Sequence, residues 1–600
     1  MIDLLPPSQE YNERIRAREA IVAHRTTVHI RLGNVRLLLA ISAVVIGWAS
    51  LIKHSIPIWW LLAPLVVFIG VAAYHTKVLR ALACAQRAVV YYRNGLARIE
   101  DKWAGRGETG ERFLDPHHIY AADLDLFGKS SLFELLSTGR TRIGEETLAA
   151  WLLAPSALEV IRDRHAAISE LRRLLDLRED LAVAGEDARV GVKPAELIKW
   201  AESSPQLQSA WLRVIAPALA LLAGASVLVW IAWDTYLPLL IVVTVEAGIV
   251  YFVRRRLDEI LHKAEHVFEN LGLLSALLAR VESERFQAPL LQSLRKKFFS
   301  ESNDAANSAS HAVRRLQGIT ERIRSRENKF FQIMDVPLMY SVQVALAAET
   351  WRGKHGNSVR GWLAAIGEME ALVSLATYSY EHPADPFPEF VSGAARFESE
   401  QLAHPLIPQR ACVRNDIKVG HPSRVLLVSG SNMSGKSTLL RSVGINTVLA
   451  MAGAPVRAHH MRLTALHVGA SIKINDSLQE GSSRFYAEIT RLRQIVDLTV
   501  GELPVMFLLD EVLQGTNSND RRVGTEGIVG GFLKRGAIGL LSTHDLALTE
   551  ICGPQADDIK NMHFQDEIKD GQMKFDYVLR DGIVTKSNGL ELMRSIGLEV

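Results

Sequence analysis

The sequence predicts a multidomain fold that combines transmembrane α-helical hairpins, an all-α core and lever domain, and a C-terminal α/β domain. Four apolar runs of roughly membrane-spanning length occur in two pairs. Apolar positions recur at helical spacing between residues 254 and 380, and three short apolar runs after residue 420 have the length of buried strands. A chain of 600 residues is also too long for a single hydrophobic core. These observations predict several structural units.

Charge and cysteine content exclude some classes of protein. The 68 basic and 66 acidic residues nearly balance, so the chain has no overall polyanion-binding character and any nucleic-acid surface must be local. Cys84, Cys412 and Cys552 are widely spaced, which excludes a disulfide framework and a zinc site. A hydrophobic content of 48% beside 22% charged residues is typical of a charged protein with membrane-length inserts.

The first elements are a charged segment at residues 1–36 and transmembrane hairpin 1 at residues 37–74; transmembrane hairpin 2 follows at residues 213–253. In each hairpin a linker of a few residues joins two apolar runs, so only a tight turn fits between them. Runs of this kind approach or reach the length needed to cross a hydrocarbon core of about 30 Å. The alternative is a soluble bundle of buried helices, but four such runs are hard to cover with protein alone.

Basic residues flank the apolar runs and predict their orientation. Arg36 precedes the first run, Lys77 follows the second, and three arginines at 254–256 follow the fourth. The positive-inside rule then places both termini and the C-terminal domain in the cytoplasm, as in a multi-pass protein of the inner (cytoplasmic) membrane. The charged first segment does not resemble a cleavable signal peptide. Glu246 interrupts the fourth run and would cost about 2.5–3.5 kcal/mol facing lipid, so we expect it to face another helix or a dimer partner.

Helical segments fill the middle of the chain. A helical linker and the start of a core domain are predicted at residues 75–212, and long amphipathic lever helices at residues 254–390, which end in a proline-rich connector. Two basic stretches, residues 294–299 and 311–329, allow two interpretations. They contact DNA phosphates, or they form solvated helix faces, and we favour the second interpretation.

The C-terminal domain, residues 391–600, contains a strand, a glycine-rich loop and a helix in succession. The strand is predicted at residues 425–429, and GSNMSGKST follows it. Backbone N–H groups of such a loop bind phosphates, which predicts a P-loop nucleotide site. The residues expected to contact the nucleotide are Gly430, Ser431, Asn432, Met433, Ser434, Gly435, Lys436, Ser437 and Thr438. Of these, Lys436 should reach the β- and γ-phosphates, and the Ser437 hydroxyl should hold Mg²⁺.

Two further apolar runs end in polar groups that nucleotide hydrolysis requires. PVMFLLDE ends in Asp510, expected to complete the Mg²⁺ site, and Glu511, expected to polarise the attacking water. AIGLLSTH ends in His544, which is suited to sensing the γ-phosphate. The sequence therefore predicts a Mg²⁺-dependent ATPase that has Glu511, Lys436 and His544 as catalytic residues.

Several motifs resemble those of the MutS family of DNA mismatch repair ATPases. GSNMSGKSTLLR resembles the family's GPNMGGKST, including Asn432 and Met433, which generic P-loops lack. LLDEVLQGTNSNDR, NDSLQEGSSRFYAEI and the STH at residues 542–544 resemble three further segments of the family's ATPase domain. Upstream, residues 123–155 resemble the start of its helical core domain. The resemblance implies an α/β P-loop ATPase domain of the ABC and MutS type.

The resemblance also implies a homodimer in which each copy completes the other's nucleotide site. Ser483 would then approach the opposite γ-phosphate, with Phe485 and Glu488 shaping that segment. Asn432 is a second candidate for contact with the γ-phosphate.

The sequence also departs from the family pattern. Arg484 stands where the family usually has threonine, and Cys412 or Val413 where it has an aromatic residue near the adenine, so base stacking should be weaker. The family's mismatch-reading domain, with its Phe-x-Glu wedge, has no counterpart in the first 120 residues. No clamp insertion, terminal dimerisation extension or nuclease is evident. We therefore expect the ATPase to be retained without the mismatch reader.

Three functions fit these features. The first is a membrane-anchored MutS-like ATPase coupled to mismatched or structured DNA, as in DNA mismatch repair. The second is a membrane scaffold or signalling ATPase without DNA binding. The third is an ABC-type transport ATPase, which we disfavour because only four spans are predicted and EGSSRFYAEI occupies the place of the LSGGQ-type segment. The sequence identifies no protein partner and no ligand that stimulates hydrolysis.

Overall fold

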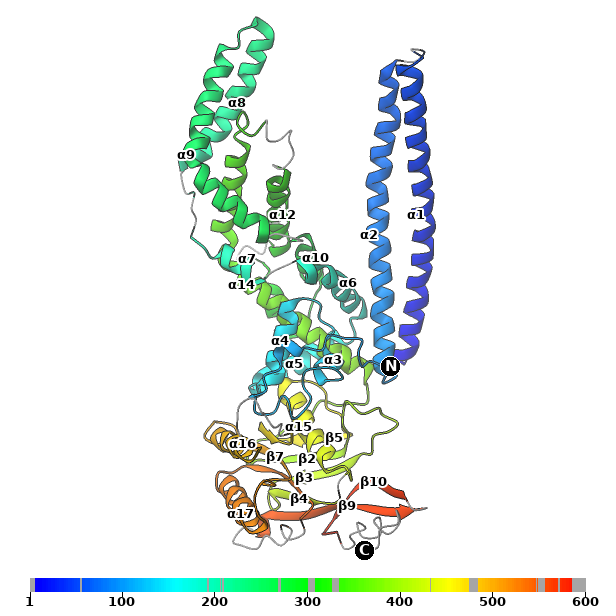
Figure 1. Cartoon of the computed structure of the whole chain (residues 1–600), viewed down its shortest axis with the longest axis vertical. Coiled ribbons are helices and arrows are strands. Elements are labelled where there is room, and N and C mark those ends of the chain that lie inside the picture. Colours follow the sequence, from blue (N-terminus) through cyan, green and yellow to red (C-terminus); the bar gives the residue numbers. More distant parts are fainter. Residues whose placement is uncertain are drawn as a thin grey trace.

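The computed structural model is an elongated molecule with two helical hairpins at one end and two β-sheets at the other (Figure 1). A helical region lies between them. The structure describes residues 6–53, 55, 57–191, 194–204, 207, 210–267, 271–299, 308–325, 334–431, 433–473, 484–545, 548, 556–569 and 572–584.

The first hairpin consists of α1 (Pro7–Leu51) and α2 (Leu62–Ile99), joined through the short 3₁₀ helix η1 (Ile58–Leu61). Pro7 occupies the first position of α1, where its missing N–H costs no helical hydrogen bond. The structure joins the charged segment and the apolar run after it into one helix, because no further proline interrupts them. α1 has 45 residues, which at about 1.5 Å per residue is more than twice the thickness of a hydrocarbon core. The polar half of the hairpin therefore extends beyond any bilayer that the apolar half enters.

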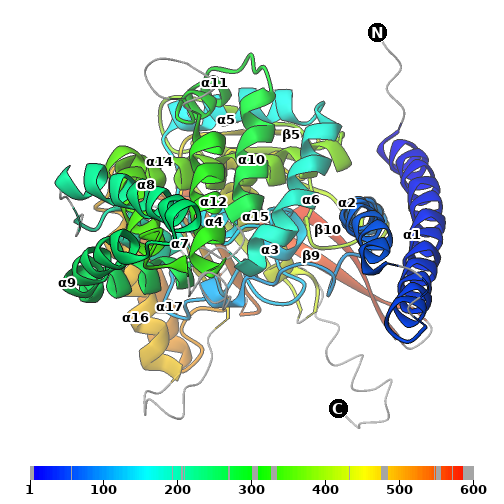
Figure 2. The same ribbon diagram turned by 90° about the horizontal axis from the view of Figure 1, so that it is seen from above.

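The second hairpin consists of α8 (Ala210–Trp233) and α9 (Leu237–Val267), which pack together on the far side of the molecule from the first hairpin (Figure 2). Among the described residues, four helices are long and apolar enough to cross a membrane, two in each hairpin. Glu246 on α9 is 0% exposed, so the prediction that it faces protein is confirmed. Neither of its carboxylate oxygens has a hydrogen-bond partner within the described part of the chain.

The helical middle region is organised around α14 (Tyr340–Glu381), whose 42 residues are buried along most of the helix. α14 contacts both hairpins (Figure 1). A Cβ atom on Gly367 would lie 2.4 Å from Ile143, so glycine at this position permits the close approach of a neighbouring helix. The other helices of the region are α3 (Leu132–Leu136), α4 (Arg142–Leu153), α5 (Leu158–Leu171), α6 (Leu175–Gly191), α7 (Pro194–Ala201), α10 (Leu271–Ser283), α11 (Pro289–Lys296) and α12 (Ala309–Ser325).

Buried polar side chains attach the base of the first hairpin to this region. Arg98, near the end of α2, donates hydrogen bonds of 2.7 Å to each carboxylate oxygen of Glu381, the last residue of α14. The Tyr11 hydroxyl also donates to Glu381, and the Tyr92 hydroxyl donates to Glu179 of α6 at 2.6 Å. We call these five residues the hairpin joint. The joint ties the hairpin to the point where α14 ends and the connector to the sheets begins.

Two sheets form the C-terminal region. The smaller has the strand order β1-β5-β2-β3, and the larger has the order β10-β9-β4-β8-β7-β6. In the larger sheet, β9 to β6 are parallel and β10 is antiparallel to β9 at one edge. The strands are β1 (Glu389–Phe390), β2 (Phe397–Leu402), β3 (Asn415–Val419), β4 (Val425–Ser429), β5 (His460–Leu463), β6 (His467–Ser471), β7 (Val505–Asp510), β8 (Ile538–Thr543), β9 (Ile559–Lys569) and β10 (Gln572–Asp581), and the helices are α15 (Lys436–Ala452), α16 (Arg484–Leu498) and α17 (Ser518–Lys534).

The three strands predicted from the sequence are neighbours in the larger sheet, in the order β4, β8, β7. Val425 and Leu427 of β4 belong to the hydrophobic core that includes α16 and α17, whereas Leu426 and Val428 belong to the core that includes α15. Both faces are thus covered, which explains why the strand is apolar throughout. Because parallel strands end at the same edge of a sheet, the polar residues after β4, β7 and β8 meet there.

Candidate active site

The loop after β4 leads into the first turn of α15. Gly435 has a φ of +106°, a conformation that residues with a Cβ rarely adopt, and a Cβ there would also lie 3.1 Å from the Tyr577 ring. Ser431 Oγ and Ser434 Oγ are buried and have no hydrogen-bond partner among the described residues. These hydroxyl groups and the N–H groups of the first helical turn are suited to an anion with several oxygens.

Lys436 is the buried cation of this loop. Its Nζ donates hydrogen bonds of 2.8 Å to the carbonyl oxygens of Gly430 and Ser431, and lies 3.9 Å from Glu511 Oε1. Burial lowers the pKa of Lys436, and the carboxylates of Glu511 and Asp510 oppose that shift. An ammonium group held by carbonyl oxygens and a distant carboxylate can transfer its hydrogen bonds to a negatively charged ligand.

Two carboxylates lie at the end of β7, opposite Lys436. Ser542 Oγ of β8 donates a hydrogen bond to Asp510 Oδ1. Glu511 Oε2 accepts a hydrogen bond from Gln514, and Glu511 Oε1 lies 3.2 Å from His544 Nδ1. Glu511 has a φ of +51°, which is unusual for a residue other than glycine and is typical of functional sites. Neighbouring side chains therefore fix the direction of both carboxylates.

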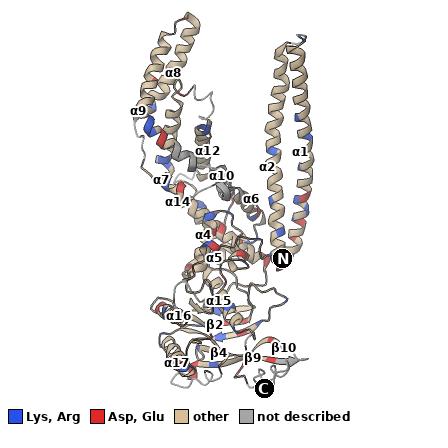
Figure 3. Ribbon diagram, in the orientation of Figure 1, with Lys and Arg blue, Asp and Glu red and all other residues tan. Residues whose placement is uncertain are grey.

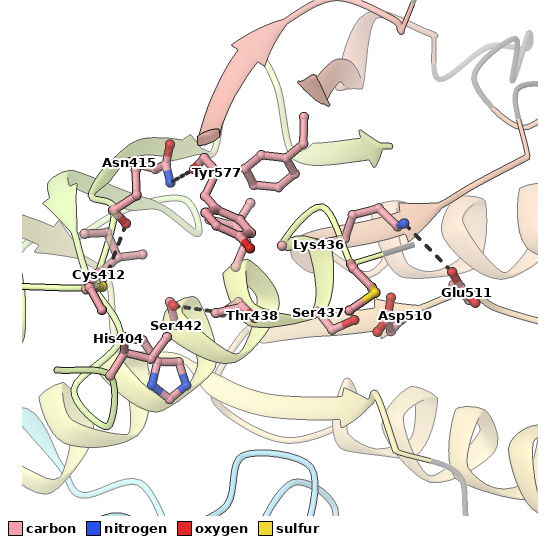
Figure 4. A pocket seen from close by; sticks show the side chains of 18 residues that line it. His404, Cys412, Asn415, Lys436, Ser437, Thr438, Ser442, Asp510, Glu511 and Tyr577 are labelled. Carbon is pink, nitrogen blue, oxygen red and sulfur yellow. Dashed lines mark hydrogen bonds and ion pairs between the residues drawn. The ribbon is translucent and has the colours of Figure 1, made fainter. Parts of the chain in front are cut away.

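Lys436 and the two carboxylates line one cavity of about 720 Å³ (Figure 4). Lys436, Asp510 and Glu511 lie at its charged end, and Cys412 lies at the other, less polar end. Val413, the next residue along the chain, also lines the cavity. Of the other loop residues predicted to contact nucleotide, the cavity lining includes Met433, Gly435, Ser437 and Thr438. Asn432 and Ser483 lie outside the described residues, so their predicted roles stay predictions.

The cavity contains an aromatic residue that sequence reasoning missed. Tyr577 of β10 lies between the two ends of the cavity (Figure 4). It has a φ of +57° and sits in an irregular part of the β9–β10 pairing. Asn415 holds this backbone on both sides, since its Nδ2 donates to the Tyr577 carbonyl at 3.0 Å and its Oδ1 accepts from the Leu579 N–H at 2.8 Å. The ring can supply the flat surface that Cys412 and Val413 lack.

Glu488 of α16 supports the segment after β7. Its carboxylate is buried and accepts a hydrogen bond of 2.6 Å from the Leu513 N–H, two residues after Glu511. Phe485 packs against the same segment, where a Cβ on Gly515 would lie 2.9 Å from the Phe485 Cβ. Both residues were predicted to shape the segment around Ser483. In this structure they position the loop that follows Glu511.

The residues at the charged end fit Mg²⁺ better than a transition metal. Ser437 offers a hydroxyl oxygen and Asp510 a carboxylate oxygen, and both line the cavity. The described residues include no group of three or more His, Cys, Asp or Glu side chains that could hold a metal by themselves. Mg²⁺ is usually held by one or two protein oxygens together with ligand phosphates and water, which agrees with this donor set.

Comparison with known proteins adds independent information. Residues 426–599 match the sequence profile of MutS domain V. The chain is 32% identical over 242 residues to the DNA mismatch repair protein MutS 2 of Halobacterium salinarum. This alignment covers 39% of this chain and 27% of the relative. It is 26% identical over 506 residues to the DNA mismatch repair protein MutS of Brevibacillus brevis, and this alignment covers 77% of this chain and 57% of the relative. It is 30% identical over 204 residues to the endonuclease MutS2 of Thermus thermophilus, and this alignment covers 34% of this chain and 26% of the relative. The chain thus spans between about a quarter and just over half the length of these relatives.

Proposed function

The chain belongs to the MutS family, and from that premise we propose that it is a membrane-anchored, Mg²⁺-dependent ATPase. One observation carries the ATPase proposal: Lys436, Asp510 and Glu511 converge on a single cavity of about 720 Å³. Pockets for small ligands usually measure about 300–1,000 Å³. ATP matches the cavity in chemistry, because its phosphates suit the charged end and its base suits the less polar end.

In this proposal the chain's own residues bind the triphosphate and direct the attacking water. Lys436 exchanges its carbonyl partners for phosphate oxygens, and the loop N–H groups bind the remaining oxygens. Ser437 and Asp510 would hold Mg²⁺, which neutralises charge on the phosphates when bound. Glu511, oriented by Gln514 and His544, polarises a water that displaces ADP from the γ-phosphorus. The products are ADP and phosphate.

We further propose that two copies form a homodimer whose ATP cycle is coupled to mismatched or structured DNA. Support comes from the relatives that are named DNA mismatch repair proteins. In such a dimer Ser483 of one copy would complete the site of the other. Glu488 then connects that segment to Glu511 through its hydrogen bond to Leu513.

The membrane part of the proposal rests on the four apolar helices of the two hairpins. Their apolar side chains are largely exposed, which suits contact with lipid tails. The basic residues that follow α9's apolar part favour a cytoplasmic location for both termini and for the site.

DNA binding by the detergent-solubilised full-length protein tests the coupling. Homoduplex, mismatched and branched fluorescent DNA would each be titrated with ADP and with ATP, at two salt concentrations. Nucleotide-dependent and structure-selective binding would support the DNA role. Weak, salt-sensitive binding that ignores the nucleotide would refute it, and would favour a scaffold or signalling ATPase that does not act on DNA.

Tyr577 provides a test of the cavity as the nucleotide site. Tyr577→Ala should weaken ATP binding about tenfold, because stacking of a base on an aromatic ring is worth about 1–3 kcal/mol. Tyr577→Phe keeps the ring and should bind ATP as the wild type does. Fluorescence titration with a labelled ATP analogue would measure both variants. Equal affinity of Tyr577→Ala and wild type would show that the ring does not contact the base.

A further inference from the structure

Exposed arginines gather on the second hairpin where its apolar part ends. The apolar run of α9 ends at Val253, and the side chains of Arg254, Arg255 and Arg256 that follow it are all exposed. Figure 3 shows the basic residues of α9 and those at the end of α12 at a similar height along the molecule, below the uncharged part of the hairpin. Arg322 lies near this end of α12 and is also exposed. We call these four residues the arginine collar.

Nearby carboxylates of the described residues do not neutralise most of the positive charge of the arginine collar. Arg254 lies 3.8 Å from Asp258, but both side chains are more than 60% exposed, at 72% and 62%, so solvent weakens this pair. Arg255, Arg256 and Arg322 have no ion-pair partner within the described part of the chain. The buried residues of α12, such as Leu316 and Ile323, lie on another face of that helix, and Arg322 lies outside this buried face.

The distribution of charge along both hairpins matches one face of a bilayer. Between Arg213 and Arg254 the sequence contains no lysine or arginine, so only one end of the second hairpin is basic. On the first hairpin, Arg31 and Lys77 are exposed just beyond the apolar part. Apart from Lys53 in the turn of the first hairpin, the basic residues of both hairpins lie on the side toward the sheets (Figure 3). A single bilayer can therefore accept both apolar parts with basic residues along the same surface.

We propose that the arginine collar binds the headgroups of anionic phospholipids. This inference rests on the proposed membrane insertion and specifies which lipids contact the protein. A bilayer that takes in α9 as far as Val253 brings lipid phosphates next to Arg254, Arg255 and Arg256, and guanidinium groups form paired hydrogen bonds with phosphate oxygens. DNA is also a polyanion, but a bilayer in this position would keep a duplex away from the collar.

Lipid selectivity of the full-length protein tests the proposal. The protein would be reconstituted in phosphatidylcholine vesicles that carry a trace of spin-labelled phosphatidylglycerol or spin-labelled phosphatidylcholine. The motionally restricted fraction of each label gives the relative association constant. We expect wild type to restrict phosphatidylglycerol in excess, and high salt to reduce that excess. Arg255→Gln/Arg256→Gln should lower the relative constant by up to about thirtyfold, or about fivefold for each arginine.

A matched control removes the same charge from another adjacent pair. Arg314 and Arg315 are exposed on α12, about two turns before Arg322, so Arg314→Gln/Arg315→Gln should keep the lipid selectivity of wild type. Flotation with phosphatidylcholine vesicles after a high-salt wash measures membrane insertion independently of binding to anionic lipid. Protein that fails to float refutes both the membrane anchor and the collar's role. Protein that inserts but restricts both labels equally refutes the collar's role alone. Loss of DNA binding in Arg255→Gln/Arg256→Gln, with lipid selectivity unchanged, would identify a nucleic-acid surface and overturn the proposal.

Discussion

Replacement of Glu511 by glutamine should slow ATP hydrolysis by about 10²- to 10⁴-fold while ATP binding is retained. Gln514 and His544 fix the direction of the Glu511 carboxylate. Glutamine has nearly the same shape but lacks the charge that polarises water. Steady-state phosphate release and equilibrium binding of a labelled ATP analogue would measure the two effects separately. The ATP-bound dimer should accumulate in this variant, which size-exclusion chromatography in detergent would detect.

Glu502 offers a matched control, since it is an exposed glutamate shortly before β7. Glu502→Gln should hydrolyse ATP at the wild-type rate. If Glu511→Gln also keeps the wild-type rate, Glu511 is not the residue that polarises water, and the proposed mechanism is wrong.

The second large effect is expected at the hairpin joint. Glu381→Ala would leave Arg98 buried without its carboxylate partner, and breaking a buried pair in this way costs about 3–5 kcal/mol. The local opening free energy of the end of α2 and the end of α14 should fall by this amount. Hydrogen–deuterium exchange read by mass spectrometry would then show amides in both segments exchanging about 10²- to 10⁴-fold faster.

An exposed pair with the same geometry provides the comparison. Arg360 donates two hydrogen bonds of 2.7 Å to Glu202, but the two side chains are 63% and 36% exposed. Glu202→Ala should therefore lower the local opening free energy by less than about 1 kcal/mol, which is less than about a fivefold change in the exchange rate. Similar exchange in Glu381→Ala and Glu202→Ala would show that the joint does not hold the hairpin in place.

The parts of the structure that depend on neighbours along the chain could be predicted from the sequence. β4, β7 and β8 lie within the predicted strands because a strand covered on both faces must be apolar throughout, and few other elements have that composition at that length. The glycine-rich loop was predictable because Gly435 adopts a conformation that few other residues reach. The apolar runs of the hairpins could also be predicted, because their length and lack of charge are read from the sequence without knowledge of tertiary contacts.

Contacts between distant segments could not be predicted in this way. Tyr577 enters the cavity because Asn415, 162 residues earlier, holds an irregular strand by two hydrogen bonds. Arg98 and Glu381 are 283 residues apart, and each looks like an ordinary surface charge in its own helix. The continuity of α1 was missed for another reason. A change from charged to apolar composition marks a change of surroundings, but it does not end a helix.

The length of α2 has a consequence for the supply of substrate. From His75 to Ile99 the helix has no predicted contact with hydrocarbon, and at about 1.5 Å per residue these 25 residues span roughly 37 Å. Surface charge on a membrane is screened over about 8 Å at physiological ionic strength. If the chain inserts in a membrane as proposed, the proposed nucleotide cavity, which lies beyond the base of this helix, would experience the bulk concentrations of ATP and Mg²⁺. This would hold even beside a strongly anionic bilayer, which repels ATP and enriches Mg²⁺. Any dependence of turnover on lipid charge would have to reach the cavity through the protein itself.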